Sequence, residues 1–263
     1  MLGARVGDPG IRALARLTLD GVPARLLAGR WGAPQVGLFR SLPSTLDAIH
    51  ELAAQGAPPG SVVLAETQTA GRGRDGRTWR SPPGGVWLGL LLQPAGAEAP
   101  TIAIRAGLVL ADALDAVLGR AAAQLKWPND VVLDDRKLAG ILCEARWQGE
   151  ALQWLALGVG VNVVNEIPAE LHDRAIALRE LVPGVGRLAL LDRIVPALSR
   201  LAAGGARLTD QELAAYAARD WLRGRQLRSP LFGRAAGLRP DGALLVELGA
   251  GTTAVREGHV ELA

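Results

Sequence analysis

Lysine is rare in this chain, and both of its lysines lie in one short stretch. Of the 29 basic residues among 263, 27 are arginine, and the two lysines are Lys126 and Lys137. Where arginine supplies nearly all of the positive charge, a retained lysine indicates a position that needs a compact ammonium rather than a planar guanidinium. Asn129, one of three asparagines, lies in the same run, Lys126–Asp130. The competing interpretation is that a coding bias produced the arginine excess and left two lysines on a solvated hairpin.

A second stretch, Gly71–Arg80, spaces four arginines with glycines and has no apolar stripe around which to fold. Because the guanidinium groups repel one another, we expect a loop that is mobile until an anion neutralises it. No Gly-Lys-Ser or Gly-Lys-Thr follows, so the loop is not a Walker-type phosphate loop. The alternative is a solvated basic loop without a ligand.

A third stretch, Trp154–Val164, is nearly all apolar but contains Gly158, Gly160 and Asn162. Alternating glycines weaken a strand, and they are tolerated where a ligand or another backbone approaches closely. A buried strand crossing would explain them almost as well. With all three stretches on one sheet, the set favours an anionic nucleotide together with a second small ligand.

Other chemistries find no support in the sequence. The three histidines, His50, His172 and His259, are scattered and lack the context of a Ser-His-Asp hydrolase. The single cysteine, Cys143, excludes an internal disulfide framework, and with no close histidine pair no metal cage is credible. Cys143 sits in an apolar strand, which favours a small core residue over a nucleophile.

Composition predicts a soluble cytoplasmic protein with a real core. Apolar residues make up 49% of the chain, and the formal net charge is +3 with a pI near 9.7. That excess suits an anionic substrate or acidic partner, but it falls short of a nucleic-acid-binding arm, so we expect no nucleic acid as a partner. No signal peptide is visible, and charges within Thr101–Leu118 make this window a buried helix rather than a membrane span.

Hydrophobic periodicity, together with turn and capping residues, predicts both strands and helices. Strands are expected at Val36–Arg40, Val62–Ala65, Val86–Leu92, Val131–Leu133, Leu138–Ala145 and Trp154–Val164. Helices are expected at Ile11–Leu17, after a capping box at Ser44–Asp47, at Thr101–Leu118, at Arg187–Ala203 with a bend at Pro196, and after a second box at Thr209–Glu212. We predict three parts, an extension (1–35), a main domain (36–220) and a small all-β unit (221–263).

From about Val36 onward, the sequence and order of these stretches closely resemble those of the biotin protein ligase family. The motifs that carry the resemblance are Ser44-Thr45, Gln68, the G-R-G-R-x-G-R-x-W run Gly71–Trp79, K-W-P-N-D at Lys126–Asp130, K-L-A-G-I-L at Lys137–Leu142, and G-x-G-x-N at Gly158–Asn162. The resemblance implies an α+β fold with a mixed β-sheet catalytic domain, helices packed on it, and a small SH3-like β-barrel at the end.

The resemblance also implies a reaction and a set of site residues. Biotin and ATP give biotinyl-5′-AMP and pyrophosphate, with Mg²⁺ accompanying the phosphates, and biotin then passes to a lysine of a biotin carboxyl carrier domain. The implied catalytic residues are Lys126, Arg72 and Arg74. Biotin would contact Ser44, Thr45, Gln68, Gly71, Arg72, Lys126, Gly158 and Gly160. The adenylate would contact Arg72, Arg74, Arg77, Trp79, Lys126, Asn129, Lys137 and Asn162. No metal ligand can be assigned.

Two departures from the family pattern bear on the site. Leu46 stands where the family usually has asparagine, and Asp75 lies inside the loop, where a neutral or basic residue is common. Two alternatives stay open at this stage. A lipoate-type ligase shares the chemistry but not the wording around Lys126. A DNA-binding biotin-responsive regulator would need a winged helix, for which about 35 preceding residues are too few. The protein is expected to be a monomer or a homodimer.

The scarcity of lysine leads to a direct test. If Lys126 lies between a carboxylate and the α-phosphate, the larger guanidinium of Lys126→Arg should displace one of them and slow adenylate formation by about 10²- to 10³-fold. Lys137→Arg should be milder. Single-turnover adenylation measures both, with circular dichroism as the folding control. A fully active Lys126→Arg would mean that the two lysines have no special role and remain by chance beside the arginine excess.

Overall fold

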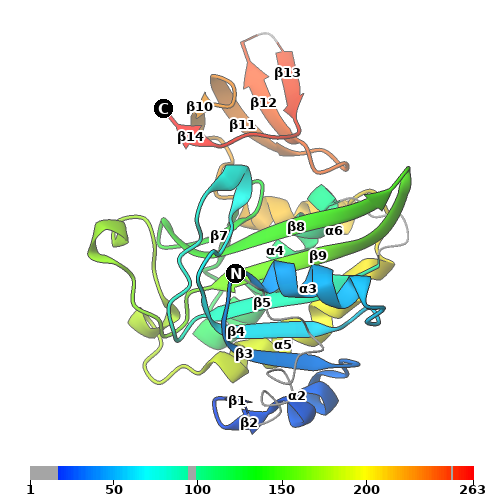
Figure 1. Cartoon of the computed structure of the whole chain (residues 1–263). Helices are drawn as coiled ribbons and strands as arrows, with labels where there is room; N and C mark the ends of the chain where they lie inside the picture. The colour runs from blue at the N-terminus through cyan, green and yellow to red at the C-terminus, as the bar shows by residue number, and fades with distance from the viewer. Residues whose placement is uncertain (1–16, 94–98, 250) are drawn as a thin grey trace.

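A mixed sheet organises the larger part of the protein (Figure 1). The computed structural model describes residues 17–93, 99–249 and 251–263. The strands of the main sheet, in chain order, are β3 (Val36–Leu42), β4 (Val62–Gln68), β5 (Val86–Leu92), β6 (Gln124–Lys126), β7 (Asp130–Leu133), β8 (Arg136–Gln148) and β9 (Ala151–Val161). Their spatial order is β3-β4-β5-β9-β8-β7-β6, and only β3 and β4 run parallel to each other. The helix expected over Ile11–Leu17 falls outside the described residues, except for Leu17.

Helices cover both faces of this sheet (Figure 1). They are α2 (Ala24–Trp31), α3 (Thr45–Ala54), α4 (Ala99–Leu118), α5 (Arg187–Ser199) and α6 (Asp210–Arg219). Along β5, Leu88 and Leu90 pack into the core shared with α4 and α5, whereas Leu91 packs with Ile49 of α3 on the opposite face. All seven β5 residues are buried, as expected for a central strand with apolar side chains on both faces. The predicted strand at Val86–Leu92 is confirmed.

Both predicted helix starts are found, with one difference in chemistry. Ser44 caps α3 by accepting a hydrogen bond from the Leu46 N–H at 3.3 Å, while the Asp47 carboxylate pairs with a loop arginine instead of closing a box. At α6 the reciprocal box between Thr209 and Glu212 is complete. The helix expected to continue to residue 203 ends at Ser199 and passes into a short 3₁₀ turn, Arg200–Ala203.

The strands predicted at Val131–Leu133 and Leu138–Ala145 are confirmed, and they pair as an antiparallel hairpin. A two-residue turn joins β7 to β8, with Asp134 at φ 49° and Asp135 at φ 60°. Aspartate tolerates this left-handed conformation, and two such residues in succession match the twist of a tight antiparallel hairpin. The predicted strand at Trp154–Val164 begins and ends earlier, as β9, because the Asn165 side chain turns the chain by accepting the Val163 N–H at 3.0 Å.

The segment before β3 contributes to the main core. Gly29, Gly32 and Pro34 interrupt the sequence pattern, which therefore predicts no helix here, yet α2 forms and is capped at Gly32 with φ 64°. Leu27 and Trp31 are buried in the core under the sheet, and a small ladder of β1 (Thr18–Leu19) and β2 (Val22–Pro23) precedes the helix. The division at residue 36 stays a prediction.

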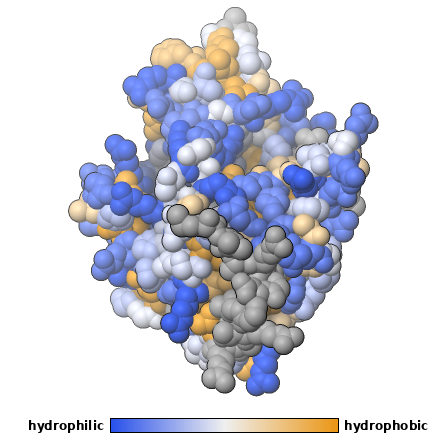
Figure 2. Space-filling model, in the orientation of Figure 1, coloured by the Kyte–Doolittle hydropathy of each residue, from blue (hydrophilic) through white to orange (hydrophobic). Residues whose placement is uncertain are grey.

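The chain ends in a five-stranded antiparallel sheet, at the top of Figure 1. Its strands are β10 (Gln226–Ser229), β11 (Gly233–Leu238), β12 (Leu244–Leu248), β13 (Gly251–Val255) and β14 (Glu261–Leu262). The order β13-β12-β11-β10-β14 leaves β13 and β14 as edges, so the described strands form a sheet and not the closed barrel that was expected. Hydrophobic atoms gather over this region in Figure 2, above a mostly hydrophilic face.

The C-terminal sheet packs on the end of the lysine hairpin. Its core joins Leu227 and Val246 to Trp127, Val132 and Trp221. The Trp127 indole donates a 2.9 Å hydrogen bond to a backbone carbonyl at residue 242, which ties the two sheets together directly. Within the described part of the chain, no helix is both long and apolar enough to cross a membrane.

A buried arginine holds α4 to α6 and to the segment before it, and this attachment can be tested. Arg105 is 5% exposed; it bonds Glu212 at 2.6 Å and two backbone carbonyls, at Gly205 and Arg207. Removing Arg105 leaves Glu212 and the two carbonyls without their hydrogen-bond donor. Arg105→Met should therefore lower the free energy of unfolding by about 3–5 kcal/mol. Arg120→Met, an exposed control at the end of α4, should change it by less than about 0.5 kcal/mol. Urea denaturation compares the two, and equal stabilities would rule out a structural role for the pair.

Candidate active site

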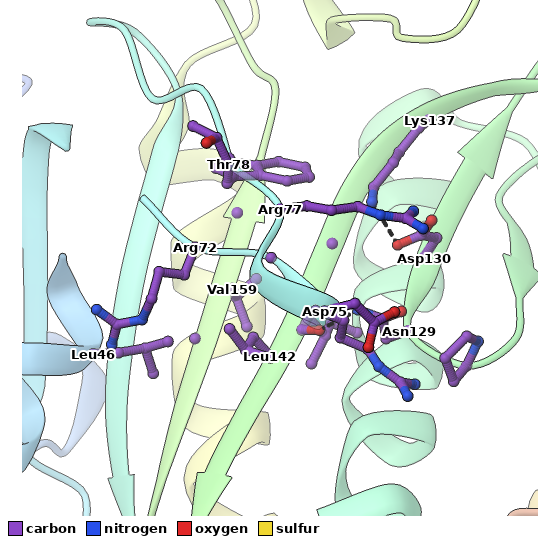
Figure 3. Close-up of a pocket in the computed structure, with 18 of the residues that line it drawn as sticks. Leu46, Arg72, Asp75, Arg77, Thr78, Asn129, Asp130, Lys137, Leu142 and Val159 are labelled. Atoms are coloured by element: carbon purple, nitrogen blue, oxygen red, sulfur yellow. Dashed lines mark hydrogen bonds and ion pairs between the residues drawn. The ribbon is translucent and has the colours of Figure 1, made fainter. Parts of the chain in front are cut away.

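A hollow lies where the lysine hairpin, the start of α3, the glycine-arginine loop and the C-terminal segment meet (Figure 3). Twelve of the fourteen site residues expected from the sequence line it, and they come from five separate parts of the chain. These are Ser44, Thr45, Gln68, Arg72, Arg74, Arg77, Trp79, Lys126, Asn129, Lys137, Gly158 and Gly160. Gly71 and Asn162 are not among the lining residues. The three motif stretches do converge on one cavity.

One end of the hollow is polar and already ordered. Because α3 follows β3 after a short turn, its first residues lie at the end of the sheet. Thr45 donates to the Gln68 Oε1 from both its backbone N–H, at 2.8 Å, and its hydroxyl, at 3.1 Å. The Gln68 amide then donates to the Ser81 hydroxyl at 2.7 Å. With Ser44 and Thr45 buried, this end presents fixed hydroxyl and amide groups rather than charges.

The floor of the hollow follows the two glycines of β9. A Cβ on Gly158 would lie 3.1 Å from the Leu46 side chain, and one on Gly160 would lie 2.6 Å from the indole nitrogen of Trp79. Glycine is therefore required at residue 160 by an aromatic ring of this same chain. The Trp79 Nε1–H is buried and has no hydrogen-bond partner within the described structure, and a buried donor left unpaired in this way is uncommon.

The loop arginines point to separate acceptors rather than at one another. Arg72 makes a two-pronged bond to Glu144, at 3.1 and 3.2 Å, and an ion pair with Asp47 at 2.8 Å. In Figure 3 it points away from Arg77, whose guanidinium donates to His259 Nδ1 at 3.0 Å. Burial opposes the charge of Arg72, but the hydrogen bonds that its guanidinium donates to the two carboxylates raise its pKa overall. The expected mobility of the loop stays a prediction.

Glu144 is held in place by a hydrogen bond with His50, which is in turn bonded to Trp154. Trp154 Nε1 donates to His50 Nδ1 at 3.0 Å, which leaves His50 Nε2 to donate to Glu144, also at 3.0 Å. The hydrogen bond from His50 lowers the pKa of Glu144, burial works against this, and Arg72 adds to the lowering. Glu144 is therefore a carboxylate at neutral pH and a firm partner for Arg72. None of this network was expected from the sequence, because its members lie up to 104 residues apart.

The two lysines have different surroundings. Lys137 forms an ion pair with Asp130 at 2.7 Å, drawn as a dashed line in Figure 3, and its ammonium lies 4.9 Å from the Trp79 ring centroid. Lys126 is half-buried, and burial lowers its pKa; Asp130 opposes the shift, whereas Lys137 and two arginines add to it. The hollow thus concentrates positive charge in a partly desolvated space, which suits polyanionic ligands.

Asn129 and Asn162, both expected in the site, make hydrogen bonds within the protein that stabilise its local structure. The Asn129 amide donates to a backbone carbonyl at Ile141 at 2.6 Å and braces the hairpin end. Asn162 is 6% exposed, and its Oδ1 accepts a hydrogen bond from Asn165 at 3.1 Å. Asn162 therefore helps to turn the chain after β9.

The C-terminal segment contributes to the site, which the sequence does not predict. Gly258, His259 and Val260 line the hollow, although the three histidines lie far apart in the sequence. Burial lowers the pKa of His259, and the nearby Arg77 and Lys126 lower it further. No local signal marks these residues, because only the packing of the second sheet on the hairpin brings them to the site.

The described residues contain no group of three or more His, Cys, Asp or Glu side chains placed to hold a metal ion. Burial raises the pKa of the Cys143 thiol to about 12, so this cysteine is a thiol at neutral pH and not a nucleophile.

The chain matches the biotin/lipoate A/B protein ligase family over residues 38–162. It is 30% identical over 240 residues to the bifunctional ligase/repressor BirA of Bacillus subtilis, a match that covers 84% of this chain and 72% of the relative. It is 31% identical over 250 residues to the biotin–[acetyl-CoA-carboxylase] ligase of Mycobacterium tuberculosis, covering 90% and 92% of the two chains.

A solved structure has a similar fold. A biotin protein ligase from Aquifex aeolicus in complex with biotin and ATP aligns with a TM-score of 0.72 and 26% identity, over 88% of this chain and 99% of that one.

The Glu144 network predicts how the loop behaves. Glu144→Gln weakens the attachment of Arg72, so amide exchange across Gly71–Arg80 should speed up in the free protein, while bound acyl-adenylate should slow it. The same loosening should follow acidification. Because the folded-state pKa lies below the ordinary 4.5, the contribution is present above pH 4.5 and is lost as the pH falls through the lowered value.

Hydrogen exchange read by mass spectrometry measures the loop directly. Glu150→Gln, an exposed carboxylate at the far end of the β8-β9 hairpin, is the matched control and should leave the loop unchanged. Equal protection of the loop in wild type, Glu144→Gln and the liganded protein would refute both the attachment and the closure.

Proposed function

Because the chain belongs to the biotin/lipoate A/B protein ligase family, we propose that its hollow joins biotin to ATP and then transfers the biotinyl group to a carrier lysine. The protein is a ligase of biotin, with biotin and ATP as substrates. The observation that carries the proposal is one cavity that combines a neutral, hydrogen-bonded end at Thr45 and Gln68 with a cationic end at Lys126. A ureido ring with a carboxylate tail needs both ends.

In the first step the biotin carboxylate oxygen attacks the α-phosphorus of ATP. An O–P bond forms, the bond to the β-phosphate oxygen breaks, and pyrophosphate leaves. Negative charge builds up on the α-phosphoryl oxygens, and Lys126, Arg72 and Arg74 are the groups proposed to stabilise it. Fixed cations in a partly desolvated site are effective here because they need no reorganisation during the reaction. Arg72 has to leave Glu144 or share its donors to take part.

In the second step the amine of the carrier lysine attacks the acyl carbon. A C–N bond forms, AMP leaves with the bonding electrons, and the amine loses a proton. We propose a biotin carboxyl carrier domain as the acceptor, in line with relatives named as acetyl-CoA-carboxylase ligases.

The remaining roles divide between the two ends. We propose that Ser44, Thr45, Gln68, Gly158 and Gly160 contact biotin, and that Arg77, Trp79, Asn129 and Lys137 lie on the adenylate side. The free Trp79 donor supports the second assignment. Gly71 and Asn162 lie outside the lining, so we propose that they act by shaping the loop and the β9 turn.

Mg²⁺ is proposed to enter with the triphosphate. It prefers oxygen ligands and usually keeps several waters beside one or two carboxylates and the substrate phosphates. Asp130 is a carboxylate that lines the hollow, and the described residues hold no larger acidic cluster. That donor set fits an ion carried by the nucleotide rather than one held permanently by the protein.

We also propose a division of the chain into domains. Residues 36–220 are proposed as the catalytic domain and residues 221–263 as a unit related to the SH3-like domain, with five antiparallel strands in support. A cytoplasmic location, the absence of nucleic-acid binding, and a monomeric or homodimeric state stay predictions.

Exchange of pyrophosphate into ATP tests the function. We expect labelled pyrophosphate to enter ATP only when biotin is present, because adenylate formation is reversible while the acyl-adenylate stays bound. Lipoate and octanoate should not support exchange. If lipoate supports it as well as biotin does, the protein is a lipoate-type ligase, and if no acid supports it, the adenylation chemistry is wrong.

A further inference from the structure

Trp221 lies behind Lys126, outside the hollow. The Lys126 ammonium is 5.1 Å from the centroid of the Trp221 ring, a distance at which an aromatic face attracts a cation. Trp221 is 9% exposed and is not among the residues that line the cavity. It does not line the hollow, so an effect on the reaction has to pass through a lining residue next to it, and Lys126 is the charged one.

The position of the Trp221 ring is fixed from several sides. Its Nε1 donates to the Asp135 carboxylate, in the β7-β8 turn, at 2.7 Å. Its backbone N–H donates to the Leu125 carbonyl at 2.9 Å, which places it beside the strand that carries Lys126. The Arg225 guanidinium stacks 3.9 Å from the ring centroid and also bonds Asp135, at 3.2 Å. A ring held in this way is a rigid surface.

The two lysines of the site are held in contrasting ways. Lys137 is bound to Asp130 at 2.7 Å, and that contact occupies a donor of its ammonium. Within the described part of the chain, Lys126 has no ion pair and no side-chain hydrogen bond, and its contact is the Trp221 face. An aromatic face attracts the charge without accepting an N–H in the way a carboxylate does. The three ammonium donors of Lys126 therefore stay available.

Charge alone would not keep Lys126 in place. The charged groups around it are Asp130, which attracts it, and Lys137, Arg77 and Arg225, which repel it. A lysine side chain has about 2 kcal/mol of rotamer entropy to lose on being fixed. Without a partner behind it, the ammonium would turn toward solvent or toward Asp130.

We propose that Trp221 is a positioning residue for adenylation, one that holds the Lys126 ammonium over the hollow with its donors free for the carboxylate and the α-phosphate. The inference rests on the proposed function, in which Lys126 stabilises the adenylation step. It adds a residue that neither the motif pattern nor the lining of the cavity identifies.

Substitution at residue 221 tests the inference by single-turnover adenylate formation. Trp221→Leu keeps apolar bulk but removes the aromatic face, and it should lower the rate about 10-fold, the scale of a partly desolvated cation–π contact. Trp221→Phe keeps a face and should recover most of that loss. The KM for biotin should change little in either variant, because the neutral end of the hollow is untouched.

A double-mutant cycle separates positioning from general damage. In a Lys126→Ala background, Trp221→Leu should have no further effect on the rate, since the group it positions is gone. Val246→Ala, in the same apolar cluster but on the C-terminal sheet, is the stability control. It should lower the thermal midpoint without changing the rate well below that midpoint. If Trp221→Leu does not fold by circular dichroism, Trp221→Phe is compared with Trp221→Met instead.

The outcomes are distinct. A wild-type rate in Trp221→Leu, or an equal rate loss with and without Lys126, overturns the inference. If Lys126→Ala itself adenylates biotin at the wild-type rate, the proposed role of Lys126 fails first. If Lys126→Ala loses the rate and Trp221→Leu does not, only the positioning role is lost.

Discussion

Mutual repulsion among cations is the constraint on which this site depends. A hollow that must attract a triphosphate gathers lysine and arginine side chains, and these repel one another unless the protein itself gives them partners. The structure gives four of these cations different partners: Glu144 for Arg72, Asp130 for Lys137, His259 for Arg77, and the Trp221 ring for Lys126. Because these partners belong to different elements, satisfying them also fixes how the elements pack.

That arrangement explains why two sheets are needed for one cavity. The main domain supplies the lysine hairpin, the glycine-containing strand β9 and the start of α3. The segment between α6 and β10 supplies Trp221, and the C-terminal segment supplies His259. Trp127 lies in the apolar core between the sheets and also borders the hollow. Packing between the sheets and the geometry of the site therefore share two residues, Trp127 at the border of the hollow and Trp221 against Lys126.

Local patterns in the sequence were sufficient for much of this structure. The central strand Val86–Leu92, the helix through Thr101–Leu118 and the complete capping box at Thr209 follow from periodicity and short-range hydrogen bonding alone. The motif residues of the hollow were also identified, since each stretch carries its own signature. What could not be predicted depends on distant partners. The His50–Glu144–Arg72 network joins residues far apart in the chain. Helix α2 forms despite a glycine within it and another at its end, because Leu27 and Trp31 gain a core to pack against.

The form in which this protein carries its positive charge also limits damage to itself. An acyl-adenylate acylates accessible amines, whereas a guanidinium group stays protonated and is a poor nucleophile. The chain has 27 arginines against two lysines, so most of its cationic surface cannot be acylated by its own product. Of the two lysine amines, one is half-buried over Trp221 and the other is paired with Asp130. An activated intermediate that escapes the hollow meets few self-modification targets, which leaves the carrier lysine with little competition from the enzyme that made it.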